Sequence, residues 1–401
     1  MTASASPGRP QVSRLAGVGP TIFTQMSALA MRTGSVNLGQ GFPDVDGPES
    51  VLERAVQALR EGANQYAPGI GVPALRQAVA AHQRRHYGIE LDPDTEVCVT
   101  TGATEGIAAA LLGLVEPGDE VMLLEPFYDS YVAMLQMAGA VRRPVTLRAP
   151  DFRLDVDALR AAVGPRTRMI LLNSPHNPTG TVLTREELTA VAEVAVEHDL
   201  VVVTDEVYEH LVFDDALSAD GHVPLCTLPG MAERTLTLSS IGKSYSLTGW
   251  KIGWATGPAH LVAALLDAKQ WLTFTSGAPL QPAAAHALDH EPDWPRALTR
   301  DLQTRRDALV AGLADAGLPV ARTAEGTYFV ATDVSHLGWS DGAEFCWALP
   351  ERAGVVAVPL QGFYDDPATA DGRHLVRWAF CKTPDLIAAG LERLAGADLT
   401  R

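Results

Sequence analysis

Residues 169–208 read MILLNSPHNPTGTVLTREELTAVAEVAVEHDLVVVTDEVY, and this stretch decides the fold class. Two short apolar runs, Met169–Asn173 and Leu200–Thr204, stand on either side of a segment whose apolar residues follow helical spacing. Continuous apolar runs are typical of strands that are buried on both faces of a sheet. Thr184 and Glu187 have the spacing of a capping box, which marks the start of the helix. Strand–helix–strand alternation predicts a mostly parallel sheet covered by helices.

Apolar runs of the same kind occur elsewhere in the first two thirds of the chain. They are found at Val97–Thr100, Glu120–Leu124 and Thr235–Leu238, and a further strand signal, Ile252–Ala255, follows Lys251. We therefore expect an α/β fold for this part. Ligands of such sheets bind beyond the carboxyl ends of the strands, so residues that directly follow strands are the first candidates for a site.

The last hundred residues have a different pattern. Asp301–Ala316 is predicted to be an amphipathic helix, and shorter strand signals follow at Tyr328–Ala331, Val355–Val358 and Leu375–Phe380. Leu360–His374 is rich in Gly, Asp and Pro, which predicts a surface loop. These signals indicate a second, smaller α+β domain.

Composition excludes several classes of partner. The chain has 401 residues and a formal net charge of -17, and such an acidic surface repels nucleic acid and anionic membranes. No apolar run approaches the ~20 residues that a membrane span needs. The four cysteines are far apart and form no C-x-x-C pair, which favours a reduced, cytoplasmic protein without a disulfide or metal framework.

Polar clusters follow four of the predicted strands. Thr100–Gly106 opens a helix whose free N–H groups and dipole suit a phosphate, although an ordinary strand–helix turn would look the same. Asn173–Gly180 is a loop with two prolines and two asparagines, which is either a rigid turn or a binding loop. Asp205 directly follows a buried strand, and it either caps a helix or pairs with a cationic group such as a ring nitrogen.

The fourth cluster, Ser239–Tyr245, contains Lys243 in a turn of small residues after a strand. Only four lysines occur in the chain, namely Lys243, Lys251, Lys269 and Lys382. The ammonium pKa of a lysine falls readily on desolvation, which frees a nucleophilic amine. A solvated loop lysine is the alternative interpretation of Lys243 taken alone.

These clusters, in this order, resemble the class I aminotransferases of the fold-type-I pyridoxal phosphate enzymes. The resemblance runs from about Arg14 to Arg393. The motifs NLGQGFPD at 37–44 and TGWKIGW at 248–254 are similar to the subgroup of kynurenine, glutamine and methionine aminotransferases. The chain is similar above all to actinobacterial members assigned as N-succinyldiaminopimelate aminotransferases.

The resemblance implies a fold and a division into domains. It implies a mostly parallel, seven-stranded sheet flanked by helices, as in the large domain of aspartate aminotransferase, with a smaller α+β domain. We expect a disordered tail at residues 1–13 and an N-terminal segment at 14–46 that joins the small domain. The large domain would span 47–290 and bind pyridoxal 5'-phosphate, and the small domain would span 291–401. A homodimer with active sites at the subunit interface is expected.

The resemblance also implies the residues around the cofactor ring. Lys243 would form the Schiff base and shuttle a proton, and Asp205 would pair with the pyridinium nitrogen. Tyr208 and Asn177 would hydrogen-bond the phenolic oxygen, and Tyr128 would stack on the ring.

Further residues are implied at the phosphate and at the substrate. Ala103, Thr104, Ser240 and Lys251 would contact the phosphate, and Tyr66 would reach it from the neighbouring subunit. At the substrate, Arg377 would hold the α-carboxylate by a bidentate fork, next to Asn177. Gly41 would lie where the small domain closes over the substrate. Phe23 matches a substrate-side aromatic residue, or else is a core phenylalanine.

The expected reaction is a ping-pong transfer of an amino group from an L-amino acid to a 2-oxo acid, 2-oxoglutarate or pyruvate. Kynurenine-type enzymes carry a Phe-His pair where this chain has Ser276-Gly277. A long or polar donor is therefore expected. The resemblance implies N-succinyl-LL-2,6-diaminopimelate or a broad set that includes methionine, glutamine and aromatic amino acids. No arginine stands out for a second carboxylate. The alternative function is a cysteine-conjugate β-lyase on the same fold.

Overall fold

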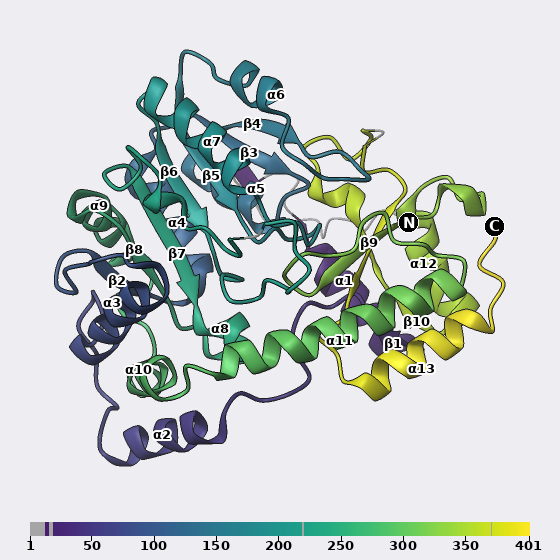
Figure 1. Cartoon of the computed structure of the whole chain (residues 1–401), viewed down its shortest axis with the longest axis horizontal. Helices are drawn as coiled ribbons and strands as arrows, with labels where there is room; N and C mark the ends of the chain where they lie inside the picture. The colour runs from purple at the N-terminus through teal and green to yellow at the C-terminus, as the bar shows by residue number, and fades with distance from the viewer. Residues whose placement is uncertain (1–12, 16–18, 219, 370) are drawn as a thin grey trace.

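A computed structural model describes residues 13–15, 19–218, 220–369 and 371–401 (Figure 1). The predicted disordered tail at 1–13 falls almost entirely outside the described residues. Its last residue, Ser13, begins a short 3-10 turn, Ser13–Leu15. The division into domains at 46/47 and 290/291 stays a prediction.

A seven-stranded sheet forms the centre of the molecule, in the order β2-β8-β7-β6-β5-β3-β4. Its strands are β2 (Val97–Thr100), β3 (Glu120–Glu125), β4 (Val141–Thr146), β5 (Thr167–Asn173), β6 (Val201–Asp205), β7 (Thr235–Ser240) and β8 (Gly253–Thr256). Only β8 is antiparallel to its neighbours, so the carboxyl ends of the other six lie at one edge of the sheet. The predicted fold is confirmed.

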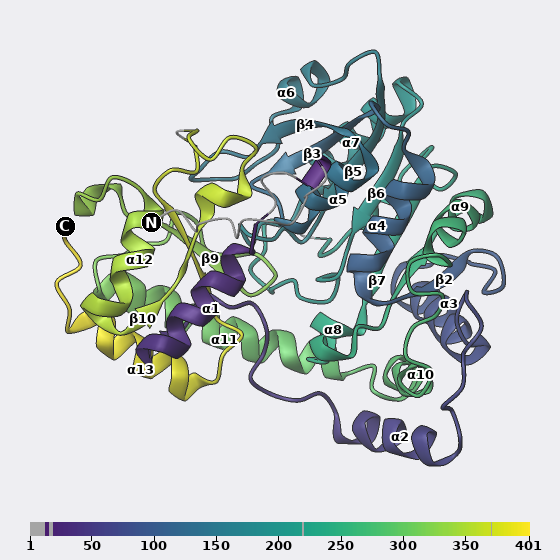
Figure 2. The same ribbon diagram turned by 180° about the vertical axis from the view of Figure 1, so that it is seen from behind.

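Helices cover both faces of this sheet (Figures 1 and 2). Neighbouring residues of a strand point to opposite faces of the sheet, and each face packs against helices. Leu123 and Leu171 pack in one core with α4 (Gly102–Leu114), whereas Leu124 and Leu172 pack in another with α7 (Arg185–Glu197). Because both faces are buried, the strands show the continuous apolar runs that predicted them. The other helices of this part are α2 (Glu49–Arg60), α3 (Pro73–Tyr87), α5 (Ser130–Ala138), α6 (Val156–Ala161), α8 (Ile241–Ser244), α9 (Ala259–Lys269) and α10 (Leu280–His290).

Two small sheets bring distant parts of the chain together. A three-stranded antiparallel sheet has the order β11-β12-β9, and a parallel pair joins β1 to β10. The strands are β1 (Val36–Asn37), β9 (Phe329–Asp333), β10 (Val355–Val356), β11 (Val358–Pro359) and β12 (Leu375–Ala379). The helices beside them are α1 (Ile22–Thr33), α12 (Gly342–Ala353) and α13 (Pro384–Ala395). In both views, α11 (Trp294–Asp315) runs from the side of α8 and α10 towards α13.

Three details differ from the prediction. β4 was missed, because its exposed and half-buried residues alternate and Pro144 interrupts the strand signal. The predicted surface loop at 360–374 is wrong at its start, since Leu360, Phe363 and Tyr364 are buried. The helix predicted to begin at Asp301 begins at Trp294.

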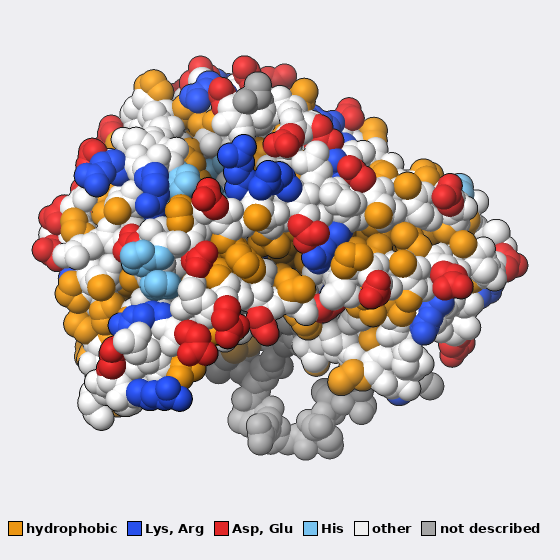
Figure 3. Space-filling model, turned by 60° about the horizontal axis from the view of Figure 1, so that its bottom comes forward, with side chains coloured by type: hydrophobic (Ala, Val, Ile, Leu, Met, Phe, Trp, Pro, Cys, Tyr) orange, Lys and Arg blue, Asp and Glu red, His pale blue; other side chains and the backbone are white. Residues whose placement is uncertain are grey.

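The surface carries acidic side chains interspersed with apolar ones. Figure 3 shows one face on which red acidic groups are scattered among blue basic groups and broad orange apolar areas. None of the helices among the described residues has the length and apolar character of a membrane span.

Candidate active site

A cavity of about 1180 Å³ lies at the edge of the central sheet where the six parallel strands end. Residues from β5, β6, β7 and the start of α4 line it together with residues from α1 and β12, which are distant in the sequence. It brings together twelve of the predicted site residues: Phe23, Gly41, Ala103, Thr104, Tyr128, Asn177, Asp205, Tyr208, Ser240, Lys243, Lys251 and Arg377. Tyr66 lies elsewhere.

Lys243 differs from the other three lysines in its contacts. Among the described residues, Lys251, Lys269 and Lys382 each donate hydrogen bonds, whereas the Nζ of Lys243 has no acceptor. It instead lies 5.8 Å from the ring centre of Tyr208 and 5.6 Å from that of Tyr328. Burial lowers the pKa of Lys243 from 10.5 to about 8. A larger fraction of this amine is therefore uncharged near neutral pH than in an exposed lysine.

Asp205 is the last residue of β6, and its carboxylate is held by neighbours. The hydroxyl of Tyr131 donates to its Oδ2 at 2.6 Å, and the backbone N–H of Val207 lies 3.4 Å from its Oδ1. Burial raises the pKa of Asp205, while the Tyr131 hydrogen bond and the charge of Lys243 oppose the rise. A buried carboxylate at a cavity wall is stabilised by a cationic partner.

The start of α4 forms another wall of the cavity. Gly102 has a φ of +67°, a left-handed conformation that favours glycine, and it turns the chain from β2 into α4. Lys251 donates from Nζ to Thr104 Oγ1 at 3.0 Å. Free N–H groups, the positive end of the helix dipole and an ammonium group thus lie together, and such a combination favours an anion.

Gly253 allows β8 to approach this helix start closely. A Cβ there would lie 2.8 Å from the carbonyl carbon of Gly102 and from the oxygen of Ser239, and 2.9 Å from the nitrogen of Ala103. Such separations are too short for real Cβ atoms, so only glycine lets these strands and the helix meet here.

Arg377, on β12, is fully buried and also lines the cavity. In the sequence it is distant from the groups described above. Its guanidinium donates to Asn177 Oδ1 at 3.0 Å and to the carbonyl of Gly39 at 2.8 Å. Among the described residues its Nε has no acceptor, and burial lowers its pKa to about 10. A cation that is buried with a free donor is suited to a carboxylate ligand.

Aromatic rings and a close backbone contact surround Arg377. The ring centre of Phe23 lies 4.7 Å from its guanidinium carbon, and that of Phe329 lies 4.0 Å away. Gly41 is packed against Phe329, since a Cβ at Gly41 would lie 2.5 Å from Phe329 Cζ. The hydroxyl of Tyr328 donates to the carbonyl of Gly41 at 2.8 Å. Phe23 therefore lines the cavity and also packs against the hydrophobic core.

Two features of the sequence prediction lie outside this cavity. Tyr66 is 85% exposed and packs edge-to-face on Phe274, with ring centres 5.5 Å apart. Ser276 is buried, and its carbonyl and hydroxyl accept hydrogen bonds from Gln281. Within one chain, Ser276-Gly277 does not line the cavity.

Sequence reasoning missed several residues of the cavity wall. Tyr131 was not among the predicted site residues, although its hydroxyl donates a hydrogen bond to Asp205. Asn173 donates to the carbonyl of Asp205 at 2.8 Å and accepts from the N–H of Asn177 at 2.8 Å, so it fixes the loop that we singled out. Arg142, paired with Asp365, also lines the cavity. It lies on β4, and because that strand was missed, no signal connected Arg142 with the site.

Comparisons with known proteins agree with this arrangement. The family model "Aminotransferase class I and II" matches residues 33–394. The chain is 55% identical to a probable N-succinyldiaminopimelate aminotransferase of Mycobacterium tuberculosis, over 96% of this chain and 98% of that protein. It is 41% identical to the methionine aminotransferase of Escherichia coli, over 95% of this chain and 97% of that one.

Solved structures show the same fold. The M. tuberculosis N-succinyldiaminopimelate aminotransferase superposes with a TM-score of 0.92, covering 96% of this chain and 99% of that one at 55% identity. An aspartate aminotransferase of Thermus thermophilus superposes with a TM-score of 0.87 at 32% identity, covering 97% and 99%. The fold and the cavity are those of an aspartate-aminotransferase-like enzyme. The chain belongs to the class I and II aminotransferase family and is an aminotransferase.

Proposed function

We propose that this enzyme uses pyridoxal 5'-phosphate to move the amino group of an L-amino acid to a 2-oxo acid. The observation that carries the proposal is Lys243. It is the one lysine of four whose Nζ has no acceptor among the described residues, and it lines the same cavity as a buried carboxylate, Asp205, and an anion-favouring helix start.

The residues present fit the cofactor. A phosphate matches the free N–H groups of Ala103 and Thr104 together with Ser240 and Lys251, and a protonated ring nitrogen matches the buried Asp205. Tyr128, Asn177 and Tyr208 line the same cavity; Tyr128 would cover the ring, and Asn177 and Tyr208 would donate to its phenolic oxygen. When bound, the cofactor supplies an electron-withdrawing ring that accepts the electron pair left by a broken Cα–H bond.

Lys243 then has two functions. Its Nζ, with a pKa of about 8, would be uncharged often enough to hold the aldehyde carbon of the cofactor covalently. When free, the same Nζ would be the base that takes the proton from the substrate Cα. Asp205 keeps the ring nitrogen protonated, and Tyr131 holds the Asp205 carboxylate in place.

Arg377 orients the substrate. Its free Nε and a guanidinium already fixed by Asn177 and Gly39 favour a bidentate contact with the α-carboxylate. Phe23 and Phe329 keep water from this ion pair, which strengthens it.

We propose N-succinyl-LL-2,6-diaminopimelate as the amino donor, with 2-oxoglutarate or pyruvate as acceptor. The likeness to the M. tuberculosis enzyme supports this choice, and so does Arg142. This substrate carries carboxylates at the end remote from the reacting amine, and Arg142 is a second arginine on the cavity wall. Its partner Asp365 is partly exposed, so a substrate carboxylate can compete for the guanidinium.

We propose that the enzyme is a cytoplasmic homodimer with its active sites at the subunit interface. Tyr66 and Phe274 are exposed and in contact, and Trp271, three residues before Phe274 in the sequence, is 83% exposed. Exposed apolar groups gathered in this way are typical of interfaces. In the dimer, Tyr66 of the partner subunit would complete the phosphate site. The four cysteines are free thiols, which agrees with a reducing compartment.

A donor panel tests the function. The purified enzyme is mixed with methionine, glutamine, kynurenine, phenylalanine and N-succinyl-LL-2,6-diaminopimelate, and the half-reaction is followed by absorbance. The fastest turnover is expected with the succinylated donor. Arg142→Leu should lower kcat/KM for that donor and leave methionine unchanged. Equal loss for both would contradict the role of Arg142, and pyruvate release from a cysteine conjugate without an oxo acid would indicate a β-lyase.

A further inference from the structure

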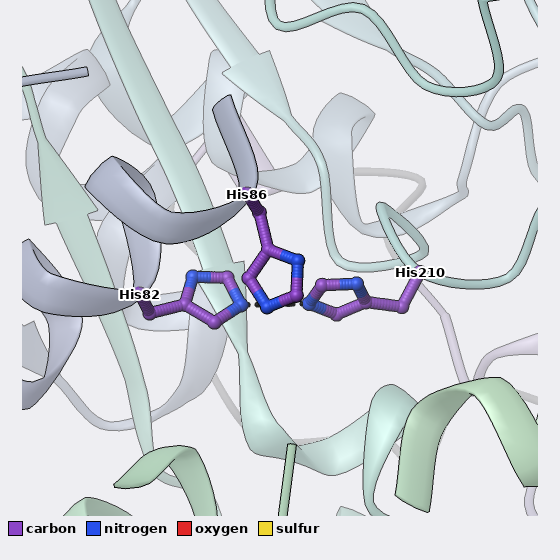
Figure 4. Close-up of side chains that lie close together, drawn as sticks. All are labelled: His82, His86 and His210. Atoms are coloured by element: carbon purple, nitrogen blue, oxygen red, sulfur yellow. Dashed lines mark hydrogen bonds between the residues drawn. The ribbon is translucent and has the colours of Figure 1, made fainter. Parts of the chain in front are cut away.

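Three histidines outside the active-site cavity lie close together. His82 and His86 are one turn apart on α3, and His210 follows β6 (Figure 4). His82 Nε2 lies 2.7 Å from His210 Nε2, and one ring nitrogen from each of the three histidines can be chosen so that all lie within 4.8 Å of one another. The three ring centres lie 4.6 to 4.9 Å apart, so the rings stand at the corners of a triangle, and all three appear together in Figure 4. Among the described residues, this is the one group of three or more potential metal ligands.

The surroundings keep these imidazoles neutral. Burial lowers the pKa of His82 to about 3 and that of His210 to about 4, and it also lowers the pKa of His86. A neutral imidazole has a free lone pair, which is the form that binds metal ions. The carboxylate of Glu209 is buried nearby, and its negative charge acts on both His82 and His210.

We propose that His82, His86 and His210 bind one divalent transition-metal ion of the Zn²⁺ class. Three imidazole nitrogens at about 2.0–2.1 Å and one open position make a common tetrahedral site. His86 is exposed, so the open position faces solvent and the ion has a path of entry. The His82–His210 pair must open by roughly half an ångström, because ligand nitrogens in such a site lie about 3.3 Å apart.

Binding requires no net loss of protons. One of the two rings carries the Nε2 proton of the hydrogen bond between the Nε2 atoms. On metal binding that ring releases this proton to solvent and takes up another at its Nδ1, so it stays neutral. The amide nitrogen of Gln83 lies 3.4 Å from His82 Nδ1. Turning that amide would present its oxygen to the new Nδ1–H, an outer contact of the kind that orients metal-binding histidines.

The site would link α3 to the segment that follows β6. That segment includes Tyr208, which lines the active-site cavity, and Glu209, which accepts a hydrogen bond from Ser239 next to Ser240. A bound ion stabilises the folded chain by mass action, because the unfolded chain does not hold the three rings together. We therefore expect a structural role.

Metal titration of the untagged holoenzyme tests the proposal. The protein is treated with a chelator, desalted and titrated with ZnCl₂ or CoCl₂, and binding is followed by metal content per chain, thermal melting and the visible spectrum of Co²⁺. One ion per chain and a rise in Tm of about 3 °C are expected. His86→Ala should weaken binding more than about 100-fold, since even the loss of an outer partner costs 10–100-fold.

The chain offers a matched control on another helix. His286 and His290 are also one turn apart, with ring centres 4.6 Å apart, but have no third histidine. His290→Ala should keep the one-ion binding and the Tm rise. Because His86 is exposed on a helix, its replacement by alanine should leave the fold intact. Absence of stoichiometric binding, or equal binding by His86→Ala, would overturn the proposal.

Discussion

Burial sets the charge states of the cavity at the scale of single residues. It lowers the pKa of Lys243 to about 8 and that of Arg377 to about 10, and it raises the pKa of Asp205. Asp205 and Arg377 are held by hydrogen bonds from Tyr131 and to Asn177, whereas Lys243 is not. The side chain that is proposed to act as the mobile base is therefore the one without a hydrogen-bond acceptor.

Replacing Arg377 should chiefly affect the amino acid. Arg377→Leu would remove the buried charge that is proposed to face the substrate carboxylate, and this should cost roughly 2–5 kcal/mol in kcat/KM. Arg377→Lys keeps the charge but loses the two-pronged contact, so its kcat/KM should lie between those of Arg377→Leu and the native enzyme. Steady-state kinetics check the effect, and the absorbance of the bound cofactor is the control, because it should not change. An unaltered KM for the donor would count against the assignment.

The lowered pKa of Lys243 predicts how cofactor-free protein takes up the cofactor. Only the uncharged amine attacks an aldehyde, so the rate should rise with pH up to about 8 and level off above it. An unperturbed lysine is mostly charged up to about pH 10.4, so the rate with Nα-acetyl-lysine under the same conditions should still rise at about pH 10. Stopped-flow absorbance from pH 6 to 10 measures both rates. A protein rate that still climbs at pH 10 would contradict the account.

At the scale of elements, apolar runs and caps were enough to predict most of the central sheet. The capping box of Thr184 and Glu187 is present, and β2 has the predicted bounds. β4 escaped because an edge strand with Pro144 has no continuous apolar run. Short strands such as β1 form by pairing with distant segments, and no local pattern encodes that pairing. Because β4 was not predicted, Arg142 on that strand could not be connected with the cavity.

The close approach of β8 to α4 gives a prediction at this scale. Gly253→Ala should push the start of α4 away from Ser239, and the enzyme should then bind pyridoxal phosphate more weakly. Gly249→Ala is the matched control, because a Cβ at Gly249 would meet no atom within 4 Å. Equilibrium dialysis gives the cofactor Kd of each variant. Equal affinity for both would show that this contact does not shape the phosphate site.

At the scale of the whole molecule, the cavity of one chain does not bring together all of the residues that were predicted at the site or its substrate side. Tyr66 is exposed, and Ser276-Gly277 does not line the cavity of its own chain. Tyr66 packs on the exposed ring of Phe274, Ser276 follows Phe274 by two residues, and the exposed Trp271 precedes it by three. A second copy packed on this surface would place them at the neighbouring cavity.

Disrupting this surface should separate the subunits. Trp271→Asp places a charge in the proposed apolar interface, so the protein should become monomeric and lose most of its activity. Leu217→Asp is the control, because Leu217 is also exposed and belongs to a segment whose Asp215 and Asp220 pair with Arg306 on α11 and Arg185 on α7. Sedimentation velocity and turnover measure both effects. A Trp271→Asp dimer with full activity would exclude this surface as the interface.

Mass spectrometry of the reduced enzyme can identify the lysine that binds the cofactor. The holoenzyme is reduced with borohydride, digested and analysed by mass spectrometry for the lysine that carries the pyridoxyl group. The account predicts the adduct on Lys243 alone, and its absence in Lys243→Ala, with the adduct unchanged in Lys382→Ala. An adduct on Lys251, Lys269 or Lys382 of the native enzyme, or normal turnover by Lys243→Ala, would contradict it.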